Sequence, residues 1–133
     1  MKLEQKFALL RIAFGLAWAV DAFFKWRPAF SSGFVGYFTD ALQSQPGAIQ
    51  AWINFWIHIV SVHPEGWALF IACAETAIAI GLIFGLLTRV ALIGSALLAF
   101  LIWAVPEGFG MLFMPGMTDI GAGIMYVFIS AAL

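Results

Sequence analysis

The chain has few charged residues and almost no cysteine. Asp, Glu, Lys and Arg make up only 10% of its 133 residues, and the net charge is −1. Because there is no basic run, nucleic acid is excluded as a partner. A single cysteine, Cys73, excludes a disulfide framework and a CxxC redox pair within one chain. A soluble domain of this size would also need far more polar surface than this composition provides.

Apolar residues are abundant instead, at 64% of the chain, with a mean hydropathy of +1.02. This composition predicts an all-α integral membrane protein that forms one membrane domain over residues 1–133, with the lipid bilayer as its surroundings. A hydrocarbon core of about 30 Å sets the length of a spanning helix. Four segments reach or approach that length and predict a four-helix transmembrane bundle: about 7–26, 67–87, 90–105 and 118–133. Thr88-Arg89 is predicted to form a tight turn between the second and third helices.

The positions of lysine and arginine predict the orientation of these helices. Lys2, Lys6 and Arg89 lie on one side of the membrane if the N-terminus is cytoplasmic, as the positive-inside rule favours. Both termini are then cytoplasmic, in an inner (cytoplasmic) membrane, and the loops 27–66 and 106–117 lie outside. Arg11 interrupts the apolar region that a signal peptide requires, so the first segment is interpreted as a retained helix.

The first outer loop carries two helical patterns of its own. Aromatic and aliphatic residues recur at helical spacing between residues 30 and 42, and again between residues 48 and 62. The second run has a polar stripe beside its aromatic one and is too short to cross a bilayer. We therefore expect short helices that lie in the membrane interface.

Ionisable residues occur within or at the edge of the apolar segments. A charge in hydrocarbon is costly unless it is paired or hydrated, so each such residue is a candidate for function. Burial of a carboxyl group at this depth requires either a proton or a cation beside it. These residues are Arg11, Asp21, Lys25, Glu75 and Asp119.

The angular positions of these residues around their predicted helices place several of them on shared faces. At about 100° per residue, Arg11, Trp18 and Lys25 share one stripe of the first helix, with Asp21 at its edge. Asp21 and Lys25 are also spaced i, i+4, in the order that favours a helical ion pair. On the second helix, Glu75 lies in a stripe of small residues, which predicts that this face packs against another helix. Arg11 and Lys25 are both open as its partner.

The fourth predicted helix repeats this pattern with Asp119, Gly123, Tyr126 and Ser130 on one face. Asp119 is also a plausible helix N-cap, which would give it a purely structural role. A rise of about 1.5 Å per residue places Asp21, Lys25 and Asp119 in the outer third of the membrane, with Glu75 below them. These residues could therefore line one polar cavity that opens outward.

Several sequence blocks in order resemble the DoxX/DoxD-like family of small four-helix membrane proteins. The first helix, LRIAFG over residues 10–15 and Lys25 downstream, is similar to the family's opening Arg-x3-Gly block. Residues 81–89 (GLIFGLLTR) after Glu75 resemble its second-helix block. Residues 103–110 (WAVPEGFG), followed by PG at 115–116 and TDIG at 118–121, resemble the DoxD branch. The resemblance implies a four-helix bundle with an accessory role in electron transfer, as in the membrane subunit of thiosulfate:quinone oxidoreductase.

The first functional hypothesis is therefore a membrane subunit of a quinone-linked oxidoreductase. Glu75, with Arg11 or Lys25 and with Asp21, would form a buried site that handles protons or binds a quinone carbonyl. A quinone needs an apolar slot with a few polar groups at its head. The sequence shows no cysteine pair, haem-ligand pair or dinucleotide motif, so a partner redox subunit is expected, or assembly with further copies of this chain. The ring contacts and remaining site residues are expected to be Trp18, Trp103, Tyr126 and Asp119.

Two alternatives remain open. Thioether groups bind Cu(I), so Met111, Met114 and Met117 in the second outer loop could form a copper site. Lys25 and Arg27 could instead bind a small anion, and either site would suit a binding or transport protein. The aromatic outer segment could also dock a partner, which would make the chain a membrane scaffold without chemistry of its own.

Overall fold

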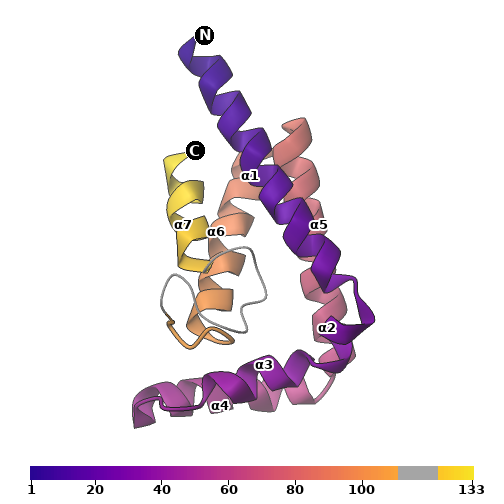
Figure 1. The fold of residues 1–133 in the computed structure, drawn as a ribbon, viewed down its shortest axis with the longest axis vertical. Helices are drawn as coiled ribbons and strands as arrows, with labels where there is room; N and C mark the ends of the chain where they lie inside the picture. The colour runs from indigo at the N-terminus through magenta and orange to yellow at the C-terminus, as the bar shows by residue number, and fades with distance from the viewer. Residues whose placement is uncertain (111–122) are drawn as a thin grey trace.

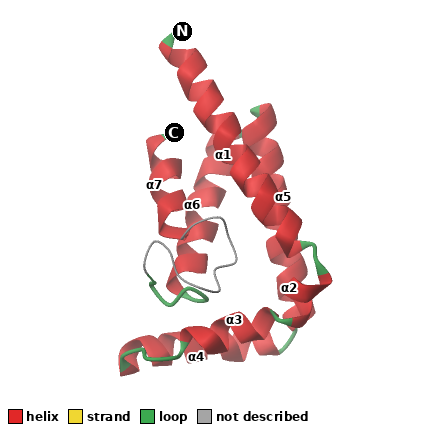
Figure 2. Cartoon of the chain, viewed as in Figure 1, coloured by secondary structure: helices red, strands yellow, loops and turns green. Residues whose placement is uncertain are grey.

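A computed structural model describes residues 1–110 and 123–133 of the chain. Within these ranges all regular secondary structure is helical, which confirms the predicted all-α class (Figure 2). The helices are α1 (Leu3–Lys25), α2 (Pro28–Ser32), α3 (Phe34–Ala41), α4 (Gly47–Ser61), α5 (Pro64–Phe84), α6 (Thr88–Ala104) and α7 (Gly123–Ala132).

The apolar helices α1, α5, α6 and α7 pack in chain order. Helix α1 packs along α5, α5 against α6, and α6 along α7. They run alternately in opposite directions, so both termini lie at the same end, and α3 and α4 run across the other end (Figure 1). Helices α1 and α5 are long and apolar enough to cross a membrane, whereas α6 has 17 residues and α7 has 10 within the described ranges.

The turn between α5 and α6 differs from the sequence prediction. The chain reverses over residues 85–87, and Thr88 and Arg89 already belong to the first turn of α6. Gly85 makes this possible because it adopts a φ of +71°, in the left-handed region that favours glycine and commonly ends helices. Its backbone N–H donates to the carbonyl oxygen of Gly81, which also accepts from Leu86 at 2.9 Å. The predicted turn at Thr88-Arg89 is therefore wrong in position.

The start of α1 also lies earlier than the apolar pattern predicts. The helix begins at Leu3 and not at residue 7, and its first residues are exposed. The backbone N–H of Lys2 donates to Gln5 Oε1 at 3.0 Å, which satisfies one polar group at this helix end. A helix does not end where its apolar face ends, because exposed polar residues also sustain its backbone hydrogen bonds.

The aromatic outer segment folds into the short helices that its periodicity predicts. Phe30 on α2 and Phe34 and Phe38 on α3 are buried in a cluster with Val60 of α4. The ring centroids of Phe30 and Phe34 lie 5.5 Å apart, edge to face. The aromatic stripe of residues 30–38 therefore faces the protein interior, whereas Trp52 and Phe55 of the second run are exposed.

A second aromatic cluster fills the space between α1 and α7. The ring of Tyr126 contacts those of Phe14 and Trp18 edge to face, with centroids 5.4 and 5.0 Å apart. Trp18 is completely buried. On another side of α1, Gly15 allows a close approach to α5, because a Cβ there would lie 2.9 Å from Ile83 Cγ1. The sequence therefore positions α1 tightly on α5 and more widely from α7.

Candidate functional site

The central feature of the interior is an ion pair between α1 and α5. Lys25 Nζ lies 3.4 Å from Glu75 Oε1, and both side chains are buried. The small-residue stripe of α5 allows this approach, since Ala72 and Ala79, which flank Glu75 on that face, are at most 3% exposed. The predicted burial of this stripe is confirmed. Of the two partners that the sequence left open for Glu75, the structure brings Lys25 to it.

Lys25 also contacts an aromatic ring from the outer segment. Its Nζ lies 5.4 Å from the centroid of the Phe30 ring, within the range of a cation–π interaction. The ammonium group therefore stands between a carboxylate and the aromatic cluster of α2 and α3.

Asp21, one turn before Lys25 on α1, accepts a hydrogen bond from α7. The hydroxyl of Tyr126 donates to Asp21 Oδ2 at 2.5 Å, and both residues are buried. This contact joins residues 105 positions apart in the sequence. We call Asp21, Lys25, Glu75 and Tyr126 the polar cluster.

A chain of neutral hydrogen bonds lies beside the polar cluster. Trp18 Nε1 donates to Ser95 Oγ on α6 at 2.9 Å, and Ser95 Oγ lies 2.7 Å from Ser130 Oγ on α7. The Ser130 hydroxyl in turn donates to the backbone carbonyl of Tyr126 at 2.7 Å. Trp18 is thus hydrogen-bonded through its indole N–H and fixes the position of α6 and α7 relative to α1.

Arg11 lies apart from the polar cluster. It is 14 residues before Lys25 on the same helix, which corresponds to about 21 Å along the axis. Its Nη1 donates to Thr88 Oγ1 at 3.3 Å, beside the turn at Gly85. The structure therefore does not bring Arg11 to Glu75, for which it was one of the two partners that the sequence left open.

Trp103 has a local role at the end of α6. Its Nε1 donates to the carbonyl oxygen of Gly110 at 2.9 Å, and its ring lies 5.0 Å from that of Phe109, edge to face. These contacts hold the turn that follows α6. The remaining predicted site residues, Asp119, Met111, Met114 and Met117, lie outside the described residues.

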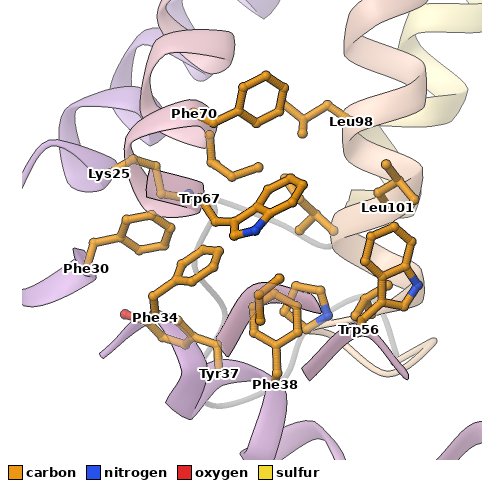
Figure 3. A pocket seen from close by; sticks show the side chains of 15 residues that line it. Lys25, Phe30, Phe34, Tyr37, Phe38, Trp56, Trp67, Phe70, Leu98 and Leu101 are labelled. Carbon is orange, nitrogen blue, oxygen red and sulfur yellow. The ribbon is translucent and has the colours of Figure 1, made fainter. Parts of the chain in front are cut away.

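An apolar pocket of about 120 Å³ opens next to the polar cluster, and Lys25 is part of its wall. Figure 3 shows Lys25 and Phe30 on one side of this pocket and Trp56 and Leu101 on the other, with Trp67 between them in that view. Residues from α1 to α6 contribute to it, so we call it the aromatic pocket. Its further lining residues are Phe34, Tyr37, Phe38, Val60, Phe70, Ile71, Leu98, Ile102, Val105 and Pro106.

Trp56, whose side chain lines the aromatic pocket, carries a buried N–H group. Trp56 Nε1 is buried and has no hydrogen-bond partner among the described residues. A buried donor without an acceptor is costly, by about 1–3 kcal/mol. The sequence pattern predicted a helix at this position but not a pocket, because periodicity gives the face of a helix and not what lies opposite it.

The described residues show no group of three or more His, Cys, Asp or Glu side chains that could hold a metal ion. Comparison with protein-family models, with curated proteins and with solved structures gives no match.

Proposed function

We propose that this chain is a membrane-embedded, DoxX/DoxD-like subunit of a quinone-linked oxidoreductase, with the aromatic pocket as its quinone site. The observation that carries this proposal is the position of Lys25. Its side chain lines the apolar pocket, and its Nζ lies 3.4 Å from the buried Glu75. A quinone head group requires this combination of an apolar slot and a few polar groups.

Exposed apolar side chains support insertion into a bilayer. Leu16 of α1, Leu97 of α6 and Phe128 of α7 are 54%, 63% and 68% exposed. Many other large apolar side chains of these helices are also exposed. Soluble monomers rarely present so much contiguous apolar surface, whereas lipid tails accept it. We therefore propose that α1, α5, α6 and α7 form a four-helix transmembrane bundle, with α3 and α4 in the interface at one end.

Lys25, Trp56 and Trp67 of the pocket wall each carry an N–H donor, which would suit a ligand with acceptors at two ends. Lys25 and Trp56 lie on opposite sides of the pocket (Figure 3). A para-quinone has a carbonyl oxygen at each end of a planar ring, whereas a fatty acid has one polar end. A water molecule needs about 10–15 Å³ of such space, so 120 Å³ holds a ring with its substituents. The tail would then extend through the open side.

The polar cluster supplies the groups that quinone chemistry needs. When bound, a quinone supplies two-electron, two-proton redox chemistry. Lys25 would donate a hydrogen bond to a carbonyl oxygen, and the carboxyl group of Glu75 can hold a proton next to it. Electrons would come from a partner redox subunit, since the sequence has no cysteine pair, haem-ligand pair or dinucleotide motif. Its resemblance to DoxD favours a thiosulfate-oxidising partner.

A binding experiment with the purified chain tests this proposal. A short-chain benzoquinone is titrated into protein in detergent, and quenching of tryptophan fluorescence reports binding near Trp56 and Trp67. The double variant Lys25→Met/Glu75→Leu removes both members of this ion pair together. We expect its quinone affinity to fall by roughly tenfold or more, as for loss of one charge-assisted hydrogen bond.

Arg27→Met is the matched control, because Arg27 is an exposed cation two residues from Lys25 and does not line the pocket. It should bind the quinone like the wild type. Leu101→Trp, a change at an exposed position of the pocket wall, should weaken binding by steric obstruction. Equal affinity of the wild type and the double variant, or no binding by the wild type, would contradict the proposal.

A further inference from the structure

A second cavity lies at the end of the molecule that holds both termini. Its volume is about 280 Å³, and it is formed by α1, the start of α6 and the last residue of the chain. We call it the Arg11 cavity. It is lined by Phe7, Ala8, Arg11, Thr88, Leu92 and Leu133.

Arg11 brings a positive charge to this cavity. Its guanidinium group remains charged in proteins and has five N–H donors. Nη1 donates to the neutral hydroxyl of Thr88 at 3.3 Å, while Nε is buried with no partner among the described residues. No carboxylate of the described residues lies within 4.0 Å of it. A half-buried charge of this kind gains free energy from an anion beside it.

The turn after α5 holds the guanidinium in place. A Cβ at Gly85 would collide with Arg11 Nη1, so the absence of a side chain there makes room for the group. The Thr88 hydroxyl lies on the same side. Arg11 is thus positioned before any ligand arrives, which reduces the entropy lost on binding.

We infer that the Arg11 cavity binds a phosphate group, carried by a phospholipid head group or present as free phosphate. Guanidinium and hydroxyl groups are suitable donors to phosphate oxygens. Phe7 and Leu92 give the cavity apolar walls, which suit the glycerol and acyl portions of a lipid. The exposed cations Lys6 and Arg89, adjacent in sequence to Phe7 and Thr88, would attract an anion to this end. This inference does not depend on the proposed quinone site.

Native mass spectrometry of the full chain in a neutral detergent tests the inference. Phosphatidylglycerol is added in one arm, and inorganic phosphate in a second arm, where a thermal shift reports binding. In at least one arm, we expect the wild type to bind and Arg11→Gln to bind roughly tenfold or more weakly. Arg89→Gln is the matched control: it removes a cation at the same end that does not line the cavity, so affinity should change by less than about threefold.

Ala8→Phe keeps Arg11 but fills part of the cavity, and it should also lose binding. It provides the decisive comparison if Arg11→Gln does not fold. Retention of phosphatidylglycerol supports a lipid site, and binding of inorganic phosphate alone supports a free-phosphate site. Absence of both from the wild type would overturn the inference, as would wild-type affinity in the cavity variants that fold.

Discussion

Lys25 Nζ and Glu75 Oε1 lie 3.4 Å apart, between two side chains that are 2% and 0% exposed. Neither charge could be buried alone at an acceptable free energy, because the loss of hydration would not be compensated. Together they connect the end of α1 to the middle of α5. Lys25 also lines the aromatic pocket, so its ammonium group makes a structural contact and is a candidate for a ligand contact.

Removing one member of the Lys25–Glu75 pair should destabilise the protein more than removing both members. Lys25→Met alone should lower the free energy of unfolding by about 3–5 kcal/mol, because it leaves Glu75 without its cation. Lys25→Met/Glu75→Leu should lie within about 1 kcal/mol of the wild type. Equilibrium unfolding in detergent measures both. Additive losses in the double variant would show that the two residues do not depend on each other.

Loss of the Tyr126 hydroxyl should weaken the attachment of α7 to α1. Tyr126→Phe keeps the ring contacts with Phe14 and Trp18 but removes the donor to Asp21. We expect a loss of about 1–3 kcal/mol in the free energy of unfolding. Tyr37→Phe is the control, a half-buried tyrosine whose ring stacks on Phe30, and should change it by less than about 0.5 kcal/mol. If both variants unfold alike, the hydrogen bond contributes nothing measurable.

Gly15→Ala should separate α1 from α5. The added Cβ would lie 2.9 Å from the Ile83 backbone nitrogen, which cannot move away as a flexible side chain could. We expect a destabilisation of about 1–3 kcal/mol. Gly36→Ala in α3 meets open space and should stabilise by about 0.4–1 kcal/mol. Thermal unfolding of the two variants measures the difference, and a neutral Gly15→Ala would show that this contact can relax.

Cysteine labelling should place the two ends of the proposed bundle on opposite sides of the membrane. In a Cys73→Ala background, Gln43→Cys lies between α3 and α4, and Arg89→Cys lies at the other end; both positions are exposed. An impermeant maleimide added to spheroplasts should label only Gln43→Cys, and Arg89→Cys should react after lysis. Labelling of both from the same side would refute the proposed orientation.

The sequence predicted the buried faces of the helices well. The predicted α5 stripe of Ala68, Ala72, Glu75, Thr76 and Ala79 is buried except for the half-buried Thr76. Of the α1 stripe, Trp18 and Lys25 are buried and Arg11 is half-buried. Such faces follow from about 3.6 residues per turn, a local property of the chain. The turn before Thr88 was misplaced because the pattern did not show that Gly85 would adopt a left-handed conformation.

The helical spacing of the sequence did not predict which residues of two different helices would pair. Arg11 and Lys25 share one stripe, and either suited Glu75 by helical phase alone. Their separation of about 21 Å along α1 means that the alignment of α1 along α5 decides between them. That alignment depends on close contacts such as Gly15 with Ile83, which are tertiary.

The amino-acid sequence by itself determined the helical class of this protein, the apolar character of its surface and the faces on which its few charges lie. These are properties of composition and of local periodicity. Tertiary structure alone decided that Lys25 pairs with Glu75, that Tyr126 reaches Asp21, and that the aromatic outer segment forms a pocket with Lys25 in its wall. The reason is physical: each of these contacts joins residues far apart in the chain, and only the way the helices fit together brings them within bonding distance.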